Sequence, residues 1–260
     1  MGAVILKRAG RFACALLLAH CVVFGADDKK IIGLDLADGF ESGRLAEFWL
    51  PGNYGTGRYV PGRVVLSTNY ARSGRYSAEL TVREGDIKQG GAEDTINERT
   101  ELDSGHYPLL GKEVCYGFSF LVPKDFPVRD VRLVISSSKQ ADVDRPLTAQ
   151  RYRNGKHTFT VECGGKRKDF TLPKIKRGEW VDMIFRARYA ERDGLLEAWM
   201  NGKKVASYKG PLAEPGYRNS FYHKVGLYRD RMKEPMTIYF DNYRTGATVE
   251  KVDPSNFIER

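Results

Sequence analysis

The sequence predicts an all-β protein, a sandwich or jelly roll of antiparallel strands. Apolar residues alternate with polar residues along most of the chain, and no segment offers a long helical period with caps. Of the 260 residues, 27 are glycine and 14 are tyrosine, and 42% are hydrophobic, which is typical of a globular protein with many turns. About a dozen strands without a linker indicate a single domain over residues 26–260.

Two stretches show the alternation most clearly, residues 113–122 and residues 180–189. A hairpin is expected where residues 195–200 and 203–208 flank Asn201-Gly202, because Asn-Gly readily adopts the positive φ angles of a type I′ turn. Further strands are expected at 31–36, 63–67, 77–83, 97–103, 131–137, 147–153, 157–163, 167–172, 222–229 and 236–245.

Residues 1–25 are predicted to be a secretory signal peptide. Lys7, Arg8 and Arg11 precede an apolar run over residues 12–24, which small residues follow. A membrane anchor is the alternative, but this run of about 13 residues is shorter than the roughly 20 that span a bilayer. We therefore expect export with cleavage near Gly25, to a secreted or periplasmic location, and no stable insertion into a membrane.

Cleavage would leave a basic protein with two cysteines. The whole chain has a net charge of +9, and loss of the three basic residues of the signal segment leaves +6. For an exported protein this charge favours an acidic polysaccharide over nucleic acid as the partner, the alternative being a basic surface without a partner. Cys115 and Cys163 either form a disulfide in the oxidising compartment or stay as two buried thiols.

The first segment that carries chemistry is Asn97-Glu98-Arg99-Thr100-Glu101-Leu102. Strand alternation places Asn97, Arg99 and Glu101 on one face. A guanidinium matches a carboxylate bidentately, and a neighbouring glutamate holds it in place, so this face suits recognition of a sugar acid. An ordinary surface ion pair is the alternative.

The second segment runs from Tyr222 to Tyr228, where Tyr222, Lys224, Gly226 and Tyr228 share a face. The glycine would leave a gap for a ligand. Lys224 would lower the pKa of the Tyr222 phenol, which then gives or takes a proton. The alternative is a tyrosine-rich strand whose rings pack on a neighbour.

The histidines offer one further candidate. His157 and His223 alternate in phase with apolar residues, so we expect them in the interior or within the sheet. His106 follows the Arg99 strand in a turn-like loop over residues 104–108. It is a candidate general base or sugar ligand, with a plain loop histidine as the alternative.

Five segments follow in the order found in the jelly-roll polysaccharide lyases: Glu98–Leu102, Gly178–Asp182, Asp193–Lys203, Tyr222–Tyr228 and Tyr239–Gly246. The chain resembles the heparin lyase I and glucuronan lyase group over nearly the whole mature length, and its site strands are similar to those of the alginate lyases. The resemblance implies a concanavalin-like jelly roll of two curved antiparallel sheets. It also implies that the concave face holds an anionic sugar chain.

The chemistry that this resemblance implies is β-elimination next to a uronate carboxyl group. The C5 proton leaves only when the carboxylate is neutralised, and an acid then protonates the departing glycosidic oxygen. By the resemblance, Arg99 neutralises the carboxylate and Tyr222 is the catalytic tyrosine. The expected substrate-binding residues are Asn97, Glu101, Lys139, Gln140, Lys224 and Tyr228. A carbohydrate-binding jelly roll without catalysis is the alternative function.

One strand departs from the family pattern. Where these lyases have glutamine and histidine, this chain has Ser137 and Lys139. A bulge would bring Gln140 into the groove, whereas a regular strand points Gln140 and Lys139 to opposite faces. An unperturbed lysine titrates at about 10.4 and is a poor base at neutral pH. The base is therefore left open among His106, Lys139 and Tyr222.

Other site chemistries find little support in the sequence. The mature chain lacks a histidine pair at zinc spacing, a phosphate loop and a serine elbow, and we find no pair of acids at the spacing of a glycoside hydrolase. No cofactor is expected. A structural calcium ion is an open alternative at residues 84–103, which include Asp86, Glu93 and Asp94. The protein is expected to be a monomer.

Overall fold

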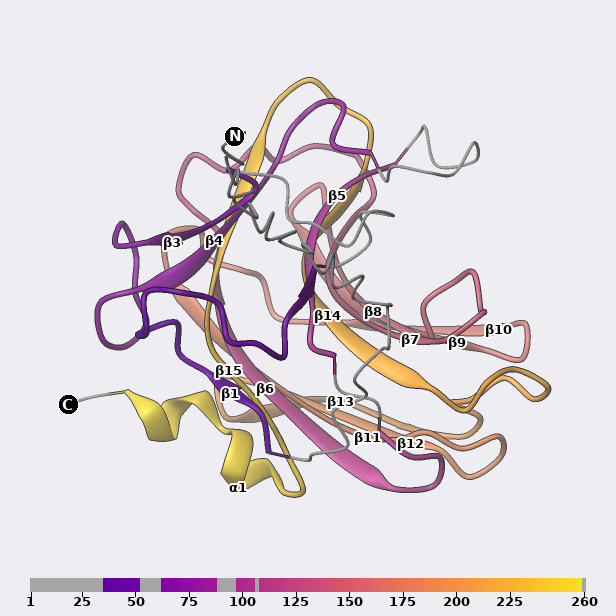
Figure 1. Ribbon diagram of the computed structural model, residues 1–260. Helices are drawn as coiled ribbons and strands as arrows, with labels where there is room; N and C mark the ends of the chain where they lie inside the picture. The colour runs from indigo at the N-terminus through magenta and orange to yellow at the C-terminus, as the bar shows by residue number, and fades with distance from the viewer. Residues whose placement is uncertain (1–34, 52–61, 88–96, 106–107, 259–260) are drawn as a thin grey trace, which may run out of the picture.

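The computed structural model describes residues 35–51, 62–87, 97–105 and 108–258, which form two antiparallel sheets packed face to face (Figure 1). The eight-stranded sheet contains, in spatial order, β13 (Lys203–Lys209), β12 (Leu195–Met200), β11 (Trp180–Arg188), β6 (Glu113–Leu121), β15 (Met236–Gly246), β4 (Ser77–Val82) and β3 (Val64–Ser67), and β1 (Ala37–Asp38) pairs with β15. The seven-stranded sheet contains β10 (Lys166–Thr171), β9 (Lys156–Cys163), β8 (Thr148–Arg153), β7 (Leu133–Gln140), β14 (Phe221–Asp230), β5 (Asn97–Asp103) and β2 (Leu50–Pro51).

The predicted fold class is confirmed, and so are the strands expected within the described residues. The predicted strand at 31–36 lies mostly outside them, as do the predicted signal peptide and its cleavage site. Asn201 and Gly202 have φ angles of 49° and 75°, which are the positive values that a type I′ hairpin requires. The only helical elements in the described part of the chain are α1 (Val249–Val252) and the 3₁₀ turn η1 (Pro254–Phe257) near the C-terminus. None of the described helices is long and apolar enough to span a membrane.

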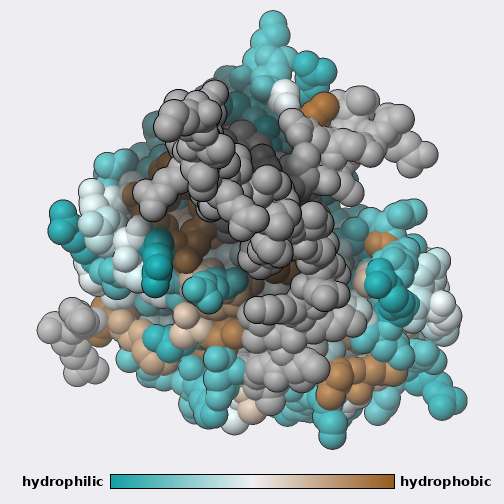
Figure 2. Space-filling view, viewed as in Figure 1, coloured by the Kyte–Doolittle hydropathy of each residue, from teal (hydrophilic) through white to brown (hydrophobic). Residues whose placement is uncertain are grey.

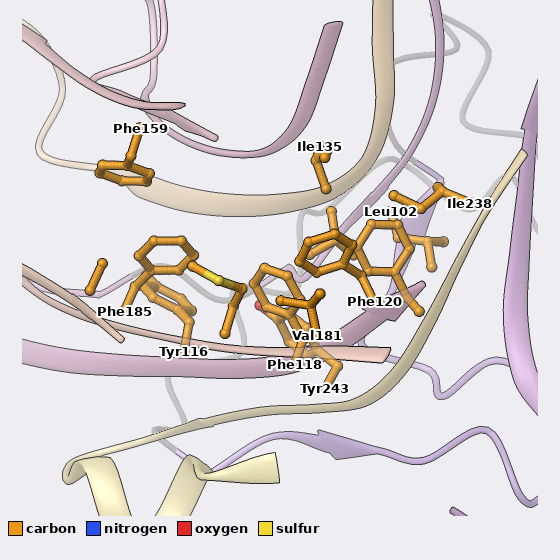
Figure 3. Packing of buried hydrophobic residues seen from close by; sticks show 14 of the residues in the cluster. Leu102, Tyr116, Phe118, Phe120, Ile135, Phe159, Val181, Phe185, Ile238 and Tyr243 are labelled. Carbon is orange, nitrogen blue, oxygen red and sulfur yellow. The ribbon is translucent and has the colours of Figure 1, made fainter. Parts of the chain in front are cut away.

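The core lies between the two sheets and is rich in aromatic rings. Phe118, Phe120 and Phe240 of the eight-stranded sheet are fully buried and lie close to one another, while Ile135 and Phe159 approach from the seven-stranded sheet (Figure 3). Burying a phenylalanine side chain stabilises a fold by about 1.5–3 kcal/mol, so the alternating pattern of the strands accounts for the sandwich.

The two cysteines are free thiols. Cys115 and Cys163 are both buried and unpaired, so the thiol alternative is correct and the disulfide alternative is wrong. Burial raises the pKa of each thiol to about 11. Neither thiol is therefore activated for chemistry.

Both interior histidines lie where the sequence places them. Gln150 and the carbonyl of Pro173 contact the two ring nitrogens of His157 at 3.0 Å each, and burial lowers the pKa of this histidine to about 4. His223 stacks on Tyr116 with 4.5 Å between ring centroids. These contacts hold both rings inside the sandwich and away from the outer face.

A buried ion pair ties β5 to β14. Glu98 and Arg229 are 0% exposed, and Nη2 of Arg229 lies 2.7 Å from Oε2 of Glu98. The second carboxylate oxygen accepts a hydrogen bond from the backbone N–H of Gly85 at 2.7 Å. Because removing one partner would leave a buried charge unpaired, this pair fixes the register of the two strands that carry the candidate site.

The seven-stranded sheet bends away from the core, so its outer face is concave (Figures 1 and 3). Strand alternation leaves one set of side chains in the core and the other set on this concave face. Leu102, Val225 and Leu227 point inward, as predicted, and are at most 1% exposed. Their sequence neighbours therefore form the concave face.

Candidate active site

The register of β5, β14 and β7 brings most of the predicted site residues onto the concave face. On β14, Tyr222 lies opposite Lys139 of β7, and Lys224 lies between Ser137 of β7 and Asp103 of β5. Further along β14, Gly226 lies opposite Glu101 and Tyr228 lies opposite Arg99.

Lys139 and Tyr222 form the central pair of this face. Directly opposite residues on antiparallel strands have Cβ atoms about 4.5–5.5 Å apart, so the amine and the phenol can reach the same small volume. Both side chains are partly exposed. The ammonium nitrogen of Lys139 donates a hydrogen bond to the backbone carbonyl of Asp144 at 3.1 Å, which positions it beside the strand.

The surroundings of Lys139 lower its pKa to about 8, chiefly through burial and next through the charge of Lys224. Arg99 acts in the same direction, whereas Glu101 and Asp144 oppose it. At pH 8 about half of the Lys139 side chains are therefore neutral amines. The condition that makes a lysine a usable base, a strongly lowered pKa, is met here.

Lys224 and Glu101 lie beneath the exposed face. They are 3% and 6% exposed, and Nζ of Lys224 is 4.0 Å from Oε2 of Glu101. Lys224 also lies 5.2 Å from the ring centroid of Tyr222, which places a cation beside the phenol. We therefore treat Lys224 and Glu101 as groups that set the local field rather than as exposed sugar ligands. The expectation that Lys224 lowers the pKa of Tyr222 stays a prediction.

Arg99 stacks on Tyr228 at the other end of the face. Its guanidinium carbon is 4.5 Å from the centroid of the Tyr228 ring, and that of Arg132 is 4.8 Å from the same centroid. Arg132 donates hydrogen bonds to Oδ1 of Asn97, to Oδ1 of Asp230 at 2.9 Å and to the Tyr228 hydroxyl at 3.3 Å. Arg132 was not among the predicted site residues, although it is in phase with the outward residues of the strand expected at 131–137.

Gln140 is not part of the site. It is fully buried, and its amide nitrogen donates to the backbone carbonyls of Glu214 at 3.0 Å and Arg218 at 3.2 Å. Its amide oxygen accepts from the backbone N–H of Glu214 at 2.7 Å. The bulge in β7 lies between Val134 and Ser136, away from Gln140. The prediction that Gln140 contacts substrate is therefore wrong. Gln140 anchors the loop over residues 214–218, and of the residues 139 and 140 only Lys139 faces the groove.

Gly226 does not create the expected gap. A Cβ atom there would lie 2.3 Å from the carbonyl oxygen of Thr100 and 2.6 Å from Cα of Glu101, and the φ of Gly226 is 144°. The glycine instead permits close approach of β14 to β5, in a conformation that other residues rarely adopt. It brings the carboxylate of Glu101 close to the β14 side chains.

Two acids, Glu101 and Asp103, share the concave face of β5, and Asp103 was not among the predicted site residues. Glu101 and Asp103 are two residues apart, and both lie near Lys224. Burial raises the pKa of Asp103, while Lys224 acts in the opposite direction, and Asp103 accepts a hydrogen bond from the backbone N–H of Gly105 at 3.1 Å. Glu101 is buried beside Lys224. Glu101 and Asp103 are therefore unlike the two carboxylates that flank the scissile bond in a glycoside hydrolase.

Two of the expected sites lie partly or wholly outside the described residues. His106 is one, and Glu93 and Asp94 of the calcium alternative are others. The remaining acid of that alternative, Asp86, pairs with Arg63 at 2.8 Å. Within the described ranges, three or more His, Cys, Asp or Glu residues do not gather in an arrangement that could hold a metal ion. His106 as a base and calcium as a structural ion therefore stay predictions.

Comparisons with known proteins agree with this fold. A family model described as polysaccharide lyase matches residues 39–244. The endo-β-1,4-glucuronan lyase of the fungus Trichoderma reesei is similar in structure, with a TM-score of 0.63 and 19% sequence identity over 81% of this chain and 99% of that chain. No curated protein matches.

Two further solved structures share the fold. An alginate lyase, determined in complex with alginate tetrasaccharide and with one lysine and one tyrosine replaced by alanine, has a TM-score of 0.54 and 14% identity over 88% of this chain and 100% of that chain. A β-glucanase catalytic domain from Podospora anserina has a TM-score of 0.55 and 14% identity over 85% of this chain and 95% of that chain. At these identities the likeness establishes the fold alone.

Proposed function

The chain belongs to the polysaccharide lyase family, and on that premise we propose that it cleaves a uronate-containing polysaccharide by β-elimination on the concave face of the seven-stranded sheet. The observation that carries the proposal is the pairing of Lys139 with Tyr222 on that face, in a field that lowers the pKa of Lys139 to about 8. A base with a lowered pKa then lies beside a phenol that can give its proton to the leaving oxygen.

In the proposed reaction the neutral amine of Lys139 removes the proton from C5 of the uronate. The electron pair forms the C4–C5 double bond as the bond between C4 and the glycosidic oxygen breaks. The phenol of Tyr222 gives its proton to that oxygen, and Lys139 leaves the step as an ammonium ion. Transfer of this proton to the tyrosine, directly or through water, restores the site. Because the two residues come from adjacent strands, removal and donation occur on the same side of the sugar ring.

The uronate carboxylate must be neutralised before C5 becomes acidic enough, and cations aimed at the developing charge supply this effect. Arg99 is a partly exposed cation of this face, and its charge acts on Lys139. Lys224 adds a second positive charge from beneath the face. We assign Arg99 to the carboxylate and Lys224 to the field around it.

The substrate class follows from charge and from the fold neighbours. The chain without residues 1–25 carries a net charge of +6, and the concave face gathers Arg99, Lys139, Lys224 and Arg132. Two of the structural neighbours are described as lyases of glucuronan and of alginate, polymers that carry a carboxylate on their sugar units. Glucuronan and alginate are therefore the first substrates to test. Export with removal of residues 1–25 is part of the same proposal.

The decisive assay incubates the purified protein with glucuronan, alginate and heparin. It follows both far-ultraviolet absorbance of the unsaturated product and the number of new reducing ends. We expect the two signals to rise together on at least one polymer, because each elimination creates one of each. Reducing ends without absorbance would indicate hydrolysis and contradict the proposal. Binding without either signal would favour the non-catalytic alternative.

A further inference from the structure

A basic pocket lies on the concave face beyond the Lys139–Tyr222 pair. It has a volume of about 470 Å³ and is lined by side chains that include Arg132, Arg151, Arg153, Lys156, Arg167 and Asp130. We call this the arginine pocket. The described surface around β7–β10, at the right of Figure 2, is largely hydrophilic.

The cations of the arginine pocket are not all balanced by acids. Three of them have a carboxylate partner: Arg153 with Asp130 at 2.7 Å, Arg167 with Asp169 at 3.0 Å and Arg132 with Asp230 at 2.8 Å. Arg151 and Lys156 form no ion pair with any described residue. Nε of Arg151 donates only to the Thr160 hydroxyl, at 3.3 Å.

Two groups of neighbouring like charges also indicate that the arginine pocket has an excess of positive charge. Arg153 and Lys156 lie directly opposite each other at the end of the β8–β9 hairpin, where like charges destabilise a strand pair. The pKa of Arg151 is lowered by burial and by the charges of Arg167 and Arg132, and the neighbouring acids Glu162 and Asp169 only partly offset this. A bound anion would relieve both arrangements, and guanidinium groups match carboxylate and sulfate oxygens well.

The strand register places the arginine pocket in line with Arg99. Arg99 lies opposite Tyr228, Tyr228 opposite Val134, and Val134 opposite Arg151. Arg99 and Arg151 therefore occupy one row across four strands, separated by three strand spacings, or about 14 Å. A polysaccharide chain that runs from the Lys139–Tyr222 pair along the concave face to Arg99 would continue across the strands into the arginine pocket.

We propose that the arginine pocket is a second anion-binding subsite, which holds a carboxylate or sulfate group of the same polysaccharide chain while another sugar unit lies between Lys139 and Tyr222. This inference deepens the proposed function and rests on it for the polymer concerned. Arg151 and Lys156 are the residues that bind the anion. The pocket adds affinity for the polymer and takes no part in the chemical step.

The test measures binding in a Tyr222→Phe background, where cleavage does not consume the ligand. Affinity electrophoresis in gels that contain alginate, glucuronan or heparin compares Arg151→Gln, Lys156→Gln and the double variant with Lys168→Gln. Lys168 is the matched control, because it is an exposed cation on β10 next to Arg167 but on the other face of the strand. We expect each pocket substitution to weaken binding roughly tenfold, the usual effect of one charged hydrogen bond, and the control to change it less than twofold.

The possible results identify which anion the arginine pocket binds, and they distinguish failure of this inference from failure of the proposed β-elimination. Loss of binding to all three polymers assigns the subsite to a carboxylate, and loss with heparin alone assigns it to a sulfate. Pocket variants that bind every polymer as the control does would overturn the inference. Should the parent protein prove unable to cleave any polymer while the pocket variants still lose binding, β-elimination fails and the subsite stands. Lys156→Gln alters an exposed hairpin position, so the test remains valid even if Arg151→Gln does not fold.

Discussion

The outer faces of the two sheets both carry charged side chains, but they differ in how these charges are paired. On the eight-stranded sheet, Arg186 pairs with Glu113 at 2.6 Å and with Glu197 at 3.3 Å. Lys204 also pairs with Glu197, at 2.6 Å. Arg186 and Lys204 are therefore held by acids of neighbouring strands, and their charges are balanced within the sheet.

On the concave face of the seven-stranded sheet, the cations lie close to one another, and the neighbouring acids only partly offset their charges. The charges of Lys224 and Arg99 repel the charged amine of Lys139. The charges of Arg132 and Arg167 repel the guanidinium of Arg151 in the same way. Burial, together with these neighbouring cations, lowers the pKa of Lys139 and of Arg151. The difference teaches that charge on one sheet supports the fold, whereas charge on the other is kept unbalanced and available for an anionic ligand.

The largest effect is expected from Tyr222→Phe, which removes only the hydroxyl. If that hydroxyl protonates the leaving oxygen, turnover should fall by roughly 10²–10⁴-fold, the usual contribution of a general acid. Polymer binding should stay nearly unchanged, because the group acts mostly in the transition state. Steady-state kinetics and affinity electrophoresis measure the two quantities. Wild-type turnover in Tyr222→Phe would refute the assignment.

A smaller effect is expected on the free energy of unfolding when a cation of either outer face is replaced by methionine. The change should have opposite signs on the two faces. The pKa of Lys139 is about 8 in the folded state, which is below its value of about 10.4 in the unfolded state. Between these two pH values the unfolded state therefore binds more protons than the folded state. At pH 7 the amine is charged in both states, and its charge destabilises the fold. Lys139→Met should therefore raise the free energy of unfolding at pH 7 by about 1–2 kcal/mol after allowance for solvent screening.

Arg186→Met is the counterpart on the eight-stranded sheet. It leaves Glu113 and Glu197 without their arginine, so stability should fall by about 0.5–1 kcal/mol. Urea unfolding at pH 7 measures both variants. A loss of stability in Lys139→Met equal to that in Arg186→Met would break the contrast between the faces.

The activity profile should respond to charges near Lys139. Because the neutral amine is the active form, kcat/KM should rise with pH through a midpoint of about 8. Lys224→Met removes a cation that lowers this pKa and should move the midpoint upward, whereas Glu101→Gln removes an anion and should move it downward. Each shift is expected to be about one unit or less. Midpoints that stay fixed in both variants would show that these charges do not set the activity.

The smallest effect is expected from salt. Added salt screens exposed charges, so KM for a polyuronate should rise several-fold between low and high ionic strength while kcat changes little. The unfolding midpoint, which depends mainly on the core, serves as the control. A KM that is independent of salt would argue against binding by the unbalanced cations.

Local patterns predicted much of this molecule. Alternation located the strands and assigned Asn97, Arg99, Glu101 and Tyr222 to the outer face, because the face of a strand residue depends only on its own phase. The Asn201-Gly202 turn was equally local. Strand pairing is not local, so the sequence did not show that Lys139 would lie opposite Tyr222, with Lys224 and Arg99 near enough to lower its pKa.

Other misses have the same origin. Gln140 was expected in the groove, but the 214–218 loop, distant in sequence, takes up its whole amide. The partner of Glu98 is Arg229, which lies on another strand and is buried with it. The arginine pocket gathers side chains of four strands, β7 to β10, and their loops, none of which carries a distinctive motif alone. These features depend on tertiary contacts that one sequence does not specify by pattern.

Chemical rescue of Lys139→Ala tests the central claim, that the amine of Lys139 is the base, most directly. The variant is assayed on a polyuronate with and without added methylamine over a range of pH. The account predicts loss of activity without the amine, and recovery in proportion to free methylamine, so that the rate rises through the pKa of methylamine instead of about 8. A Lys139→Ala protein that keeps the wild-type rate and pH profile without methylamine would contradict the account and place the base at Tyr222 or His106.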